Sequence, residues 1–178
     1  MNKVFIGMIF VFLDFDLNIG NSKIGLIPDF IGYIYMYKGA TELIIYSEKF
    51  ENVCPIIAVM ATYSVLTYVA GLMGLSVSLG IPVMYILSLI ATIISLIISN
   101  RIVKGVGDIE IATSSDLNYI KLYSTWKHLA AFSIATSVQF IIPTMFIFIA
   151  CAIISFIIGI YYLFVFNTSK KLYYENVE

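Results

Sequence analysis

Residues 13–37 read LDFDLNIGNSKIGLIPDFIGYIYMY and carry three acids, Asp14, Asp16 and Asp29, in a chain that is otherwise strongly apolar. All three lie at or near the ends of apolar segments, where an ionised side chain is unfavourable unless it reaches water or a partner. Pro28 followed by Asp29 is typical of a helix start, because a carboxylate is stabilised at the positive end of the helix dipole. The stretch therefore predicts a water-exposed turn between two helices.

The same acids raise the alternative of a cation site. Asp14, Asp16 and Asn18 alternate like the first oxygen ligands of a calcium loop. Such a loop needs Gly at its sixth position and Glu at its twelfth, where this chain has Ile19 and Gly25. The spacing excludes that loop, but a weakly held cation or a proton remains possible if the second helix start folds back over the turn. The candidate polar cluster at this outer turn consists of Asp14, Asp16, Asn18 and Asp29.

The runs F-D-L-N-I-G (15–20) and I-G-L-I-P-D-F-I-G-Y-I (24–34) carry a resemblance. They are similar to the N-terminal signature of a group of small, uncharacterised multi-pass membrane proteins of low-GC Gram-positive bacteria. The resemblance implies a bacterial source and a membrane location. It implies no catalytic residue, because that group has no assigned activity.

The composition predicts an integral membrane protein that spans the bilayer several times. The chain has 178 residues, of which 61% are hydrophobic and 12% charged, against roughly 25% charged in soluble domains. Mean hydropathy is +0.98. A net charge of −1 argues against nucleic acid as a partner, because binding to phosphates needs a basic face. We expect no cofactor and no metal, since His128 is the only histidine and the cysteines, Cys54 and Cys151, are far apart.

A transmembrane helix needs about 20 mainly apolar residues. On that measure we predict an all-α, polytopic helical bundle of about six transmembrane helices forming one domain. The predicted spans are residues 2–17, 28–46, 54–73, 81–100, 123–138 and 143–166. The last two form a nearly continuous apolar stretch, which is either one long kinked helix or two helices joined around residues 139–144.

The distribution of basic residues favours two helices there. Cytoplasmic loops of membrane proteins are enriched in Lys and Arg. Six spans with both termini cytoplasmic leave only Lys23 on the outer side. The basic residues on the inner side are then Lys3, Lys49, Arg101, Lys104, Lys121, Lys127, Lys170 and Lys171.

The second predicted helix contains Lys38 near its middle and Glu42 one turn later. Each charge disfavours insertion by about 2.5–3.5 kcal/mol at a helix centre. Residues four apart share one helix face, so we predict an intramembrane ion pair between Lys38 and Glu42. A role in transport is the alternative. Gly32 and Gly39 lie on one side of the same helix and predict close packing of a neighbouring helix.

Residues 101–122 are predicted to form the one sizeable cytoplasmic loop, which contains an interfacial amphipathic segment. Asp116 is interpreted there as the N-cap of the following helix. Tyr119, Tyr123 and Trp126 follow at helical spacing. Aromatic side chains prefer the headgroup level of a bilayer, so we expect these three to be interfacial anchors.

The sequence does not favour an enzyme, because no paired histidines, nucleophile elbow, phosphate loop or dinucleotide motif is present. Two functions remain. One is a non-catalytic protein of the cell membrane that binds, senses or assists another membrane component. The other is a small transporter or channel for an ion or small solute. Expected partners are the lipid bilayer and either a membrane-protein partner or further copies of the chain.

Overall fold

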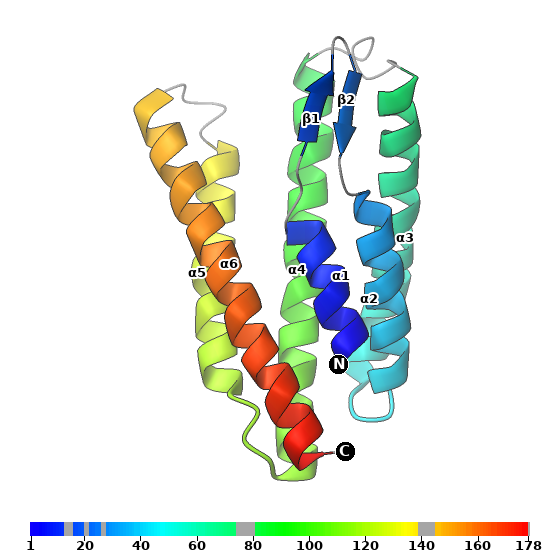
Figure 1. Ribbon diagram of the computed structural model, residues 1–178, viewed down its shortest axis with the longest axis vertical. Coiled ribbons are helices and arrows are strands. Elements are labelled where there is room, and N and C mark those ends of the chain that lie inside the picture. The colour runs from blue at the N-terminus through cyan, green and yellow to red at the C-terminus, as the bar shows by residue number, and fades with distance from the viewer. Residues whose placement is uncertain (13–15, 20–21, 26–27, 74–80, 139–144, 178) are drawn as a thin grey trace.

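The computed structural model describes residues 1–12, 16–19, 22–25, 28–73, 81–138 and 145–177, and it describes no side chain in 13–27, 74–82, 84 or 138–148. These parts form six helices and one two-stranded hairpin (Figure 1). The elements are α1 (Asn2–Phe12), β1 (Asp16–Ile19), β2 (Ser22–Gly25), α2 (Asp29–Leu43), α3 (Glu48–Leu72), α4 (Ile81–Thr113), α5 (Tyr119–Val138) and α6 (Met145–Asn176). The helical prediction is confirmed, and the last apolar stretch forms two separate helices.

The bundle has three helices long and apolar enough to cross a membrane. Within the described parts, these are Glu48–Leu72 in α3, Tyr85–Thr113 in α4 and Ile149–Asn176 in α6. Helix α1 is shorter than these three, and its 11 residues extend over only about 16 Å. It ends about halfway up the neighbouring long helices, and the strand hairpin lies above it (Figure 1).

The turn expected between the first two helices is a β-hairpin, and the first helix ends at Phe12 instead of residue 17. The strands are antiparallel, with Asp16 opposite Gly25 and Ile19 opposite Ser22. Polar and apolar residues alternate along β1, which is the period of a strand and not of a helix. The sequence Gly-Asn between the strands is also a typical two-residue hairpin connection.

The expected loop 101–122 is a second correction, because α4 continues as a helix to Thr113. Ile102, Val103, Val106 and Ile109 are fully buried. Their spacing follows one helix face, so burying that face stabilises helix where the charge content suggested a loop. The connection to α5 is reduced to residues 114–118.

Carboxylates from α4 hold the starts of α3 and α5 at this end of the bundle. Asp108 accepts hydrogen bonds from Ser47 and Lys49, next to the start of α3. Glu110 accepts from the backbone N–H groups of Leu117 and Tyr119 at 2.8 and 3.1 Å, and so caps α5. Asp116, which the sequence suggested as that cap, instead accepts from the N–H of Asn118 in the preceding turn.

The two short N-terminal helices meet through glycines, as the sequence predicted for Gly32 and Gly39. An added Cβ on Gly7 of α1 would lie 2.5 Å from the carbonyl oxygen of Gly32, and one on Gly39 would lie 2.6 Å from Val4. The backbones of α1 and α2 are therefore in direct contact. Side chains larger than hydrogen at these positions would force the helices apart.

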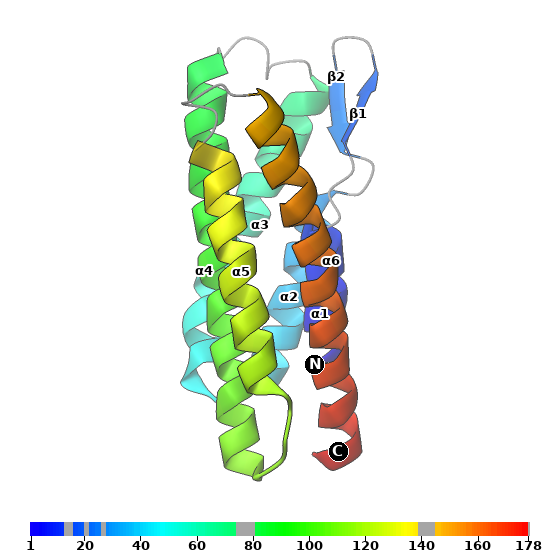
Figure 2. The ribbon, with the colours of Figure 1, turned by 90° about the vertical axis from the view of Figure 1, so that its left-hand side faces the viewer.

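Both ends of the described chain lie at the same end of the bundle. The phenol oxygen of Tyr174 lies 3.5 Å from the Met1 amino group and 3.1 Å from the N–H of Asn2. The Lys170 ammonium group lies 4.3 Å from the centre of the Phe5 ring. Figure 2 shows α1 beside the lower half of α6, with α5 packed along the other side of α6.

We expect Gly7→Ala to lower the free energy of unfolding by about 1–3 kcal/mol, because the new methyl group meets backbone atoms that cannot move independently. The matched control is Gly159→Ala in α6, whose Cβ would meet only Leu129 at an ordinary 3.9 Å. That variant should be neutral or more stable by up to about 1 kcal/mol. Denaturation in detergent, followed by circular dichroism, measures both. Equal effects of the two changes would contradict the close contact.

Candidate functional site

In helices α3 to α6, charge is confined to one half of the bundle, whereas Asp29 begins α2 at its upper end and Asp16 and Lys23 belong to the strand hairpin. In α3 no charged residue follows Glu51, and in α4 none precedes Arg101. In α5 none follows His128, and in α6 none precedes Lys170. The half of the bundle that lies away from the chain termini is therefore the part suited to lipid.

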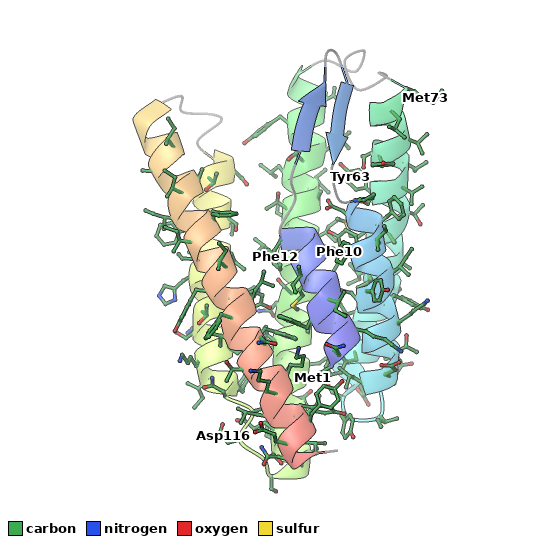
Figure 3. The ribbon with its side chains drawn as sticks, in the orientation of Figure 1. Met1, Phe10, Phe12, Tyr63, Met73 and Asp116 are labelled. Atoms are coloured by element: carbon green, nitrogen blue, oxygen red, sulfur yellow. The ribbon has the colours of Figure 1, made fainter. Side chains whose placement is uncertain are left out.

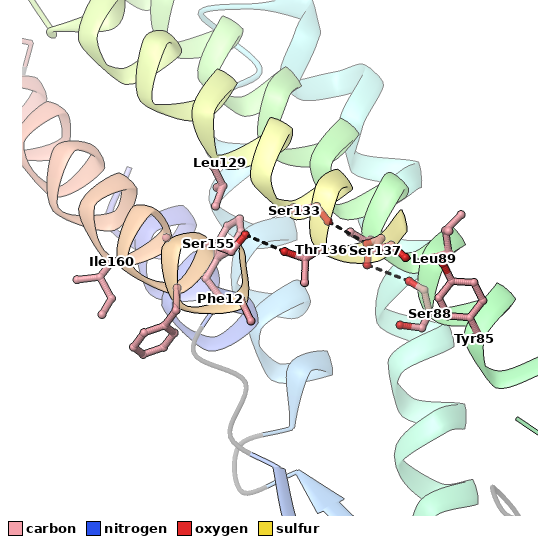
Figure 4. A pocket seen from close by; sticks show the side chains of 14 residues that line it. Phe12, Tyr85, Ser88, Leu89, Leu129, Ser133, Thr136, Ser137, Ser155 and Ile160 are labelled. Carbon is pink, nitrogen blue, oxygen red and sulfur yellow. Dashed lines mark hydrogen bonds between the residues drawn. The ribbon is translucent and has the colours of Figure 1, made fainter. Parts of the chain in front are cut away.

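A groove of about 460 Å³ lies in this uncharged half, between α4, α5 and α6 and above the end of α1 (Figure 4). The volume is within the usual range of about 300–1,000 Å³ for small-molecule sites. Seven of its fourteen lining side chains carry a hydroxyl group. These are Tyr85, Ser88 and Thr92 of α4, Ser133, Thr136 and Ser137 of α5, and Ser155 of α6.

The groove exists because α1 ends early. Helix α6 packs on α1 along its lower half, where the Phe12 and Tyr162 rings lie 5.6 Å apart in an edge-on arrangement. Phe12 points between α6 and α4 at the upper end of α1 (Figure 3) and also lines the groove. Above Phe12, α6 leans away from α4 (Figure 1). Between α4 and α5, the phenol of Tyr85 donates a hydrogen bond to the carbonyl oxygen of Ser137.

Three of the seven hydroxyl groups donate their proton to a carbonyl of their own helix. Thr92 donates to the carbonyl of Ser88 at 2.9 Å, and Thr136 donates to that of Phe132 at 2.8 Å. Ser137 donates to the carbonyl of Ser133 at 2.9 Å. A hydroxyl oxygen that has donated its proton still has lone pairs, so these groups present hydrogen-bond acceptors.

Between the hydroxyl groups the walls of the groove are apolar, and the neighbouring outer surfaces of α4 and α6 are apolar as well. Phe156 and Ile160 line it from α6 and are each about half exposed. Ile86 and Ile90 of α4, which do not line the groove, are 57% and 46% exposed. A molecule in the groove would therefore contact both hydroxyl oxygens and hydrocarbon.

The acids of the outer turn are only partly placed. Asp14 lies outside the described residues, and Asp16 and Asn18 are placed only as backbone in β1. Asp29 is the first residue of α2, one residue after the predicted start at Pro28, which is instead the N-cap. Within the described part of the chain, no group of three His, Cys, Asp or Glu side chains suited to a metal ion occurs.

The expected Lys38–Glu42 pair is wrong. Glu42 forms its ion pair with Lys3 of α1, and both of these side chains are about half exposed. Lys38 is exposed one turn before Glu42 and makes no ion pair with a described residue. The reason is the close approach of α1, which brings the Lys3 amino group to Glu42. Residue spacing along α2 could not reveal a partner on another helix.

Tyr119, Tyr123 and Trp126 form one continuous row on α5, as their spacing predicted. The rings of Tyr119 and Tyr123 lie 5.8 Å apart, and those of Tyr123 and Trp126 lie 5.9 Å apart, both nearly parallel. The row packs towards α4, since the Trp126 indole donates to Ser99 at 3.0 Å. Burial raises the pKa of the Tyr119 phenol. The residues thus join two helices, and a position at the headgroup level stays a prediction.

The sequence analysis missed the groove. Pairs of small polar residues four apart, such as Ser88 with Thr92 and Ser133 with Ser137, were a detectable signal. These pairs are an ambiguous signal for a groove, because small residues at this spacing also allow close helix packing. The structure shows both uses on α5, where Thr136 contacts Ser155 of α6 at 3.4 Å beside the open groove.

Comparison of the chain with protein-family models, with curated proteins and with solved structures finds no match. The case for a function therefore rests on the residues and their geometry.

We expect Ser99→Ala to lower the free energy of unfolding by about 1 kcal/mol, because the Trp126 indole loses its hydrogen-bond acceptor. Trp126 is the only tryptophan, so its fluorescence follows this contact directly. Ser95→Ala, one turn earlier on α4, is the control, since the Ser95 hydroxyl makes no hydrogen bond to a described residue. An unchanged emission spectrum and midpoint in Ser99→Ala would show that the α4–α5 contact does not depend on this bond.

Proposed function

We propose that the chain is a non-catalytic, multi-pass protein of the cell membrane that binds another membrane component in the groove between α4, α5 and α6. One observation supports this above all others: the groove combines hydroxyl groups with apolar walls in the uncharged half of the bundle. A site with few polar groups among apolar ones is the usual form of a small-molecule site. Because this half of the bundle would lie within the bilayer, the ligands that reach the groove would be molecules already dissolved in the bilayer.

We infer for the same reasons that the bundle has six membrane segments with both termini cytoplasmic. The two chain ends meet at the charged end of the bundle. That end also carries Arg101, Lys121 and Lys127, and cytoplasmic surfaces are enriched in such residues. Helices α1 and α2 then reach only part of the way across, and the strand hairpin continues towards the outer side.

The transporter alternative has less support. Transport needs polar groups that face a path through the membrane. Lys38 and Glu42, the charges proposed for it, are exposed on the opposite side of the bundle from the groove, and neither lines it. Asp14, the third candidate, lies outside the described residues.

We expect Ser88→Phe to abolish retention of a lipid in the groove. Ser88 is an exposed lining residue of α4, so a phenyl ring there fills the groove from its open side without entering the core. Native mass spectrometry of protein extracted in mild detergent measures retained molecules. We expect one bound lipid in the wild type and none in the variant. Ile90→Phe, two residues away and outside the groove, is the control and should retain the lipid. Equal retention in all three would count against this function.

The orientation has its own test. In a Cys54→Ala, Cys151→Ala background, we expect Lys171→Cys to be labelled by a membrane-impermeant thiol reagent only after the cells are permeabilised. Lys171 is exposed at the charged end, so access to the reagent depends on the side of the membrane and not on burial. Met73→Cys, at the other end of α3 and 68% exposed, should be labelled in intact cells. The reverse pattern would invert the proposed topology.

A further inference from the structure

The groove has a chemical preference that follows from its hydrogen bonds. Thr92 of α4 and Thr136 of α5 both line it, and each has donated its proton to a carbonyl of its own helix. Their oxygens therefore accept hydrogen bonds but have no proton left to donate while these bonds last. A ligand that carries O–H or N–H donors is therefore matched at these two oxygens, whereas the hydroxyl groups of Ser88 and Ser133, which also line the groove, donate to no described residue.

The groove also selects against charge. None of its described lining side chains is ionisable in the physiological range, and the charged residues of the four surrounding helices lie at the other end of the bundle. A phosphate or ammonium group here would leave water without gaining a partner of opposite charge, which is strongly unfavourable. A neutral headgroup loses far less.

The apolar walls identify the remaining part of the ligand. Phe156 and Ile160 border the groove while remaining about half exposed on the outer surface of α6. A volume of about 460 Å³ corresponds to about 15 water-sized units at about 30 Å³ each. This is enough for a small headgroup and the first part of a chain, so the rest of a lipid would extend along α6 into the bilayer.

We propose that the groove binds an uncharged lipid with a free hydroxyl group, of the diacylglycerol class, through the hydroxyl oxygens of Thr92 and Thr136. The proposal rests on the proposed function and adds the chemical class of the bound component. The headgroup hydroxyl donates to one or both threonine oxygens, and the acyl chains leave past Phe156 and Ile160. No bond is made or broken in the ligand.

Matched lipids test the class. Purified, delipidated protein in detergent is titrated with dioleoylglycerol, with its 3-acetyl ester and with dioleoylphosphatidylglycerol, and bound lipid is counted by native mass spectrometry. The ester keeps the chains and the neutral charge but lacks the donor. We expect dioleoylglycerol to bind about tenfold more tightly than the ester, as one donated hydrogen bond at the upper end of the usual range would give, and the anionic lipid to bind more weakly than dioleoylglycerol.

Matched variants test the residues. Thr92→Val with Thr136→Val keeps side-chain shape but removes both acceptors, and we expect it to bind dioleoylglycerol and the ester equally. Thr62→Val in α3 is the control, because Thr62 donates to the carbonyl of Ala58 in the same way but lies outside the groove. It should keep the tenfold preference.

The outcomes separate the two proposals. Equal binding of dioleoylglycerol and its ester by the wild type overturns recognition of a hydroxyl donor, and a preference for the anionic lipid overturns the uncharged class. Either result leaves the groove as a lipid site if Ser88→Phe still prevents binding. Binding that Ser88→Phe does not affect would overturn the groove itself, and with it the proposed function.

Discussion

The direct backbone contact between α1 and α2 determines the arrangement of the rest of the bundle. Gly7 and Gly32 let these two short helices approach without side chains between them. Helix α1 is thereby fixed on the bundle although it is too short to cross a membrane alone. Its aromatic residues then hold α6, through Phe5 on Phe166 and Phe12 against Tyr162. Because α1 stops at Phe12, the upper half of α6 has no such neighbour, and the groove lies in that place.

Polar groups in the two halves of the bundle have different roles. At the charged end, carboxylates join different elements: Glu42 pairs with Lys3 and Asp108 with Lys49, which are distant in sequence, and Glu110 binds the start of the next helix, α5. These pairs lie near water, so each one alone contributes little to stability, and Glu110 matters mainly because it satisfies two backbone donors. In the uncharged half, hydroxyl groups replace carboxylates. Those of Thr92, Thr136 and Ser137 donate to carbonyls of their own helices, which lowers the cost of burying them in apolar surroundings.

This division explains why binding is supported better than transport. A path for ions needs charged or strongly polar groups that continue through the uncharged half. The described side chains there offer hydroxyl groups on one groove, open towards apolar surfaces of α4 and α6. In the proposed function, such a surface would exchange molecules laterally with the bilayer. The same geometry makes hydroxyl-bearing neutral lipids a better match than phospholipids, whose charge would have no partner among the described groove residues.

The sequence by itself determined the helical class, the lipid-compatible composition, the separation of the last two helices and the glycine face of α2, because each depends on local periodicity and hydropathy. It also determined that Tyr119, Tyr123 and Trp126 share one side of a helix. Only the tertiary structure decided that Glu42 pairs with Lys3, that Glu110 and not Asp116 caps α5, and that 101–113 is helical. It also revealed the groove. These features depend on which helices approach one another and where α1 ends, and contacts between residues far apart in the chain leave no periodic signal along it.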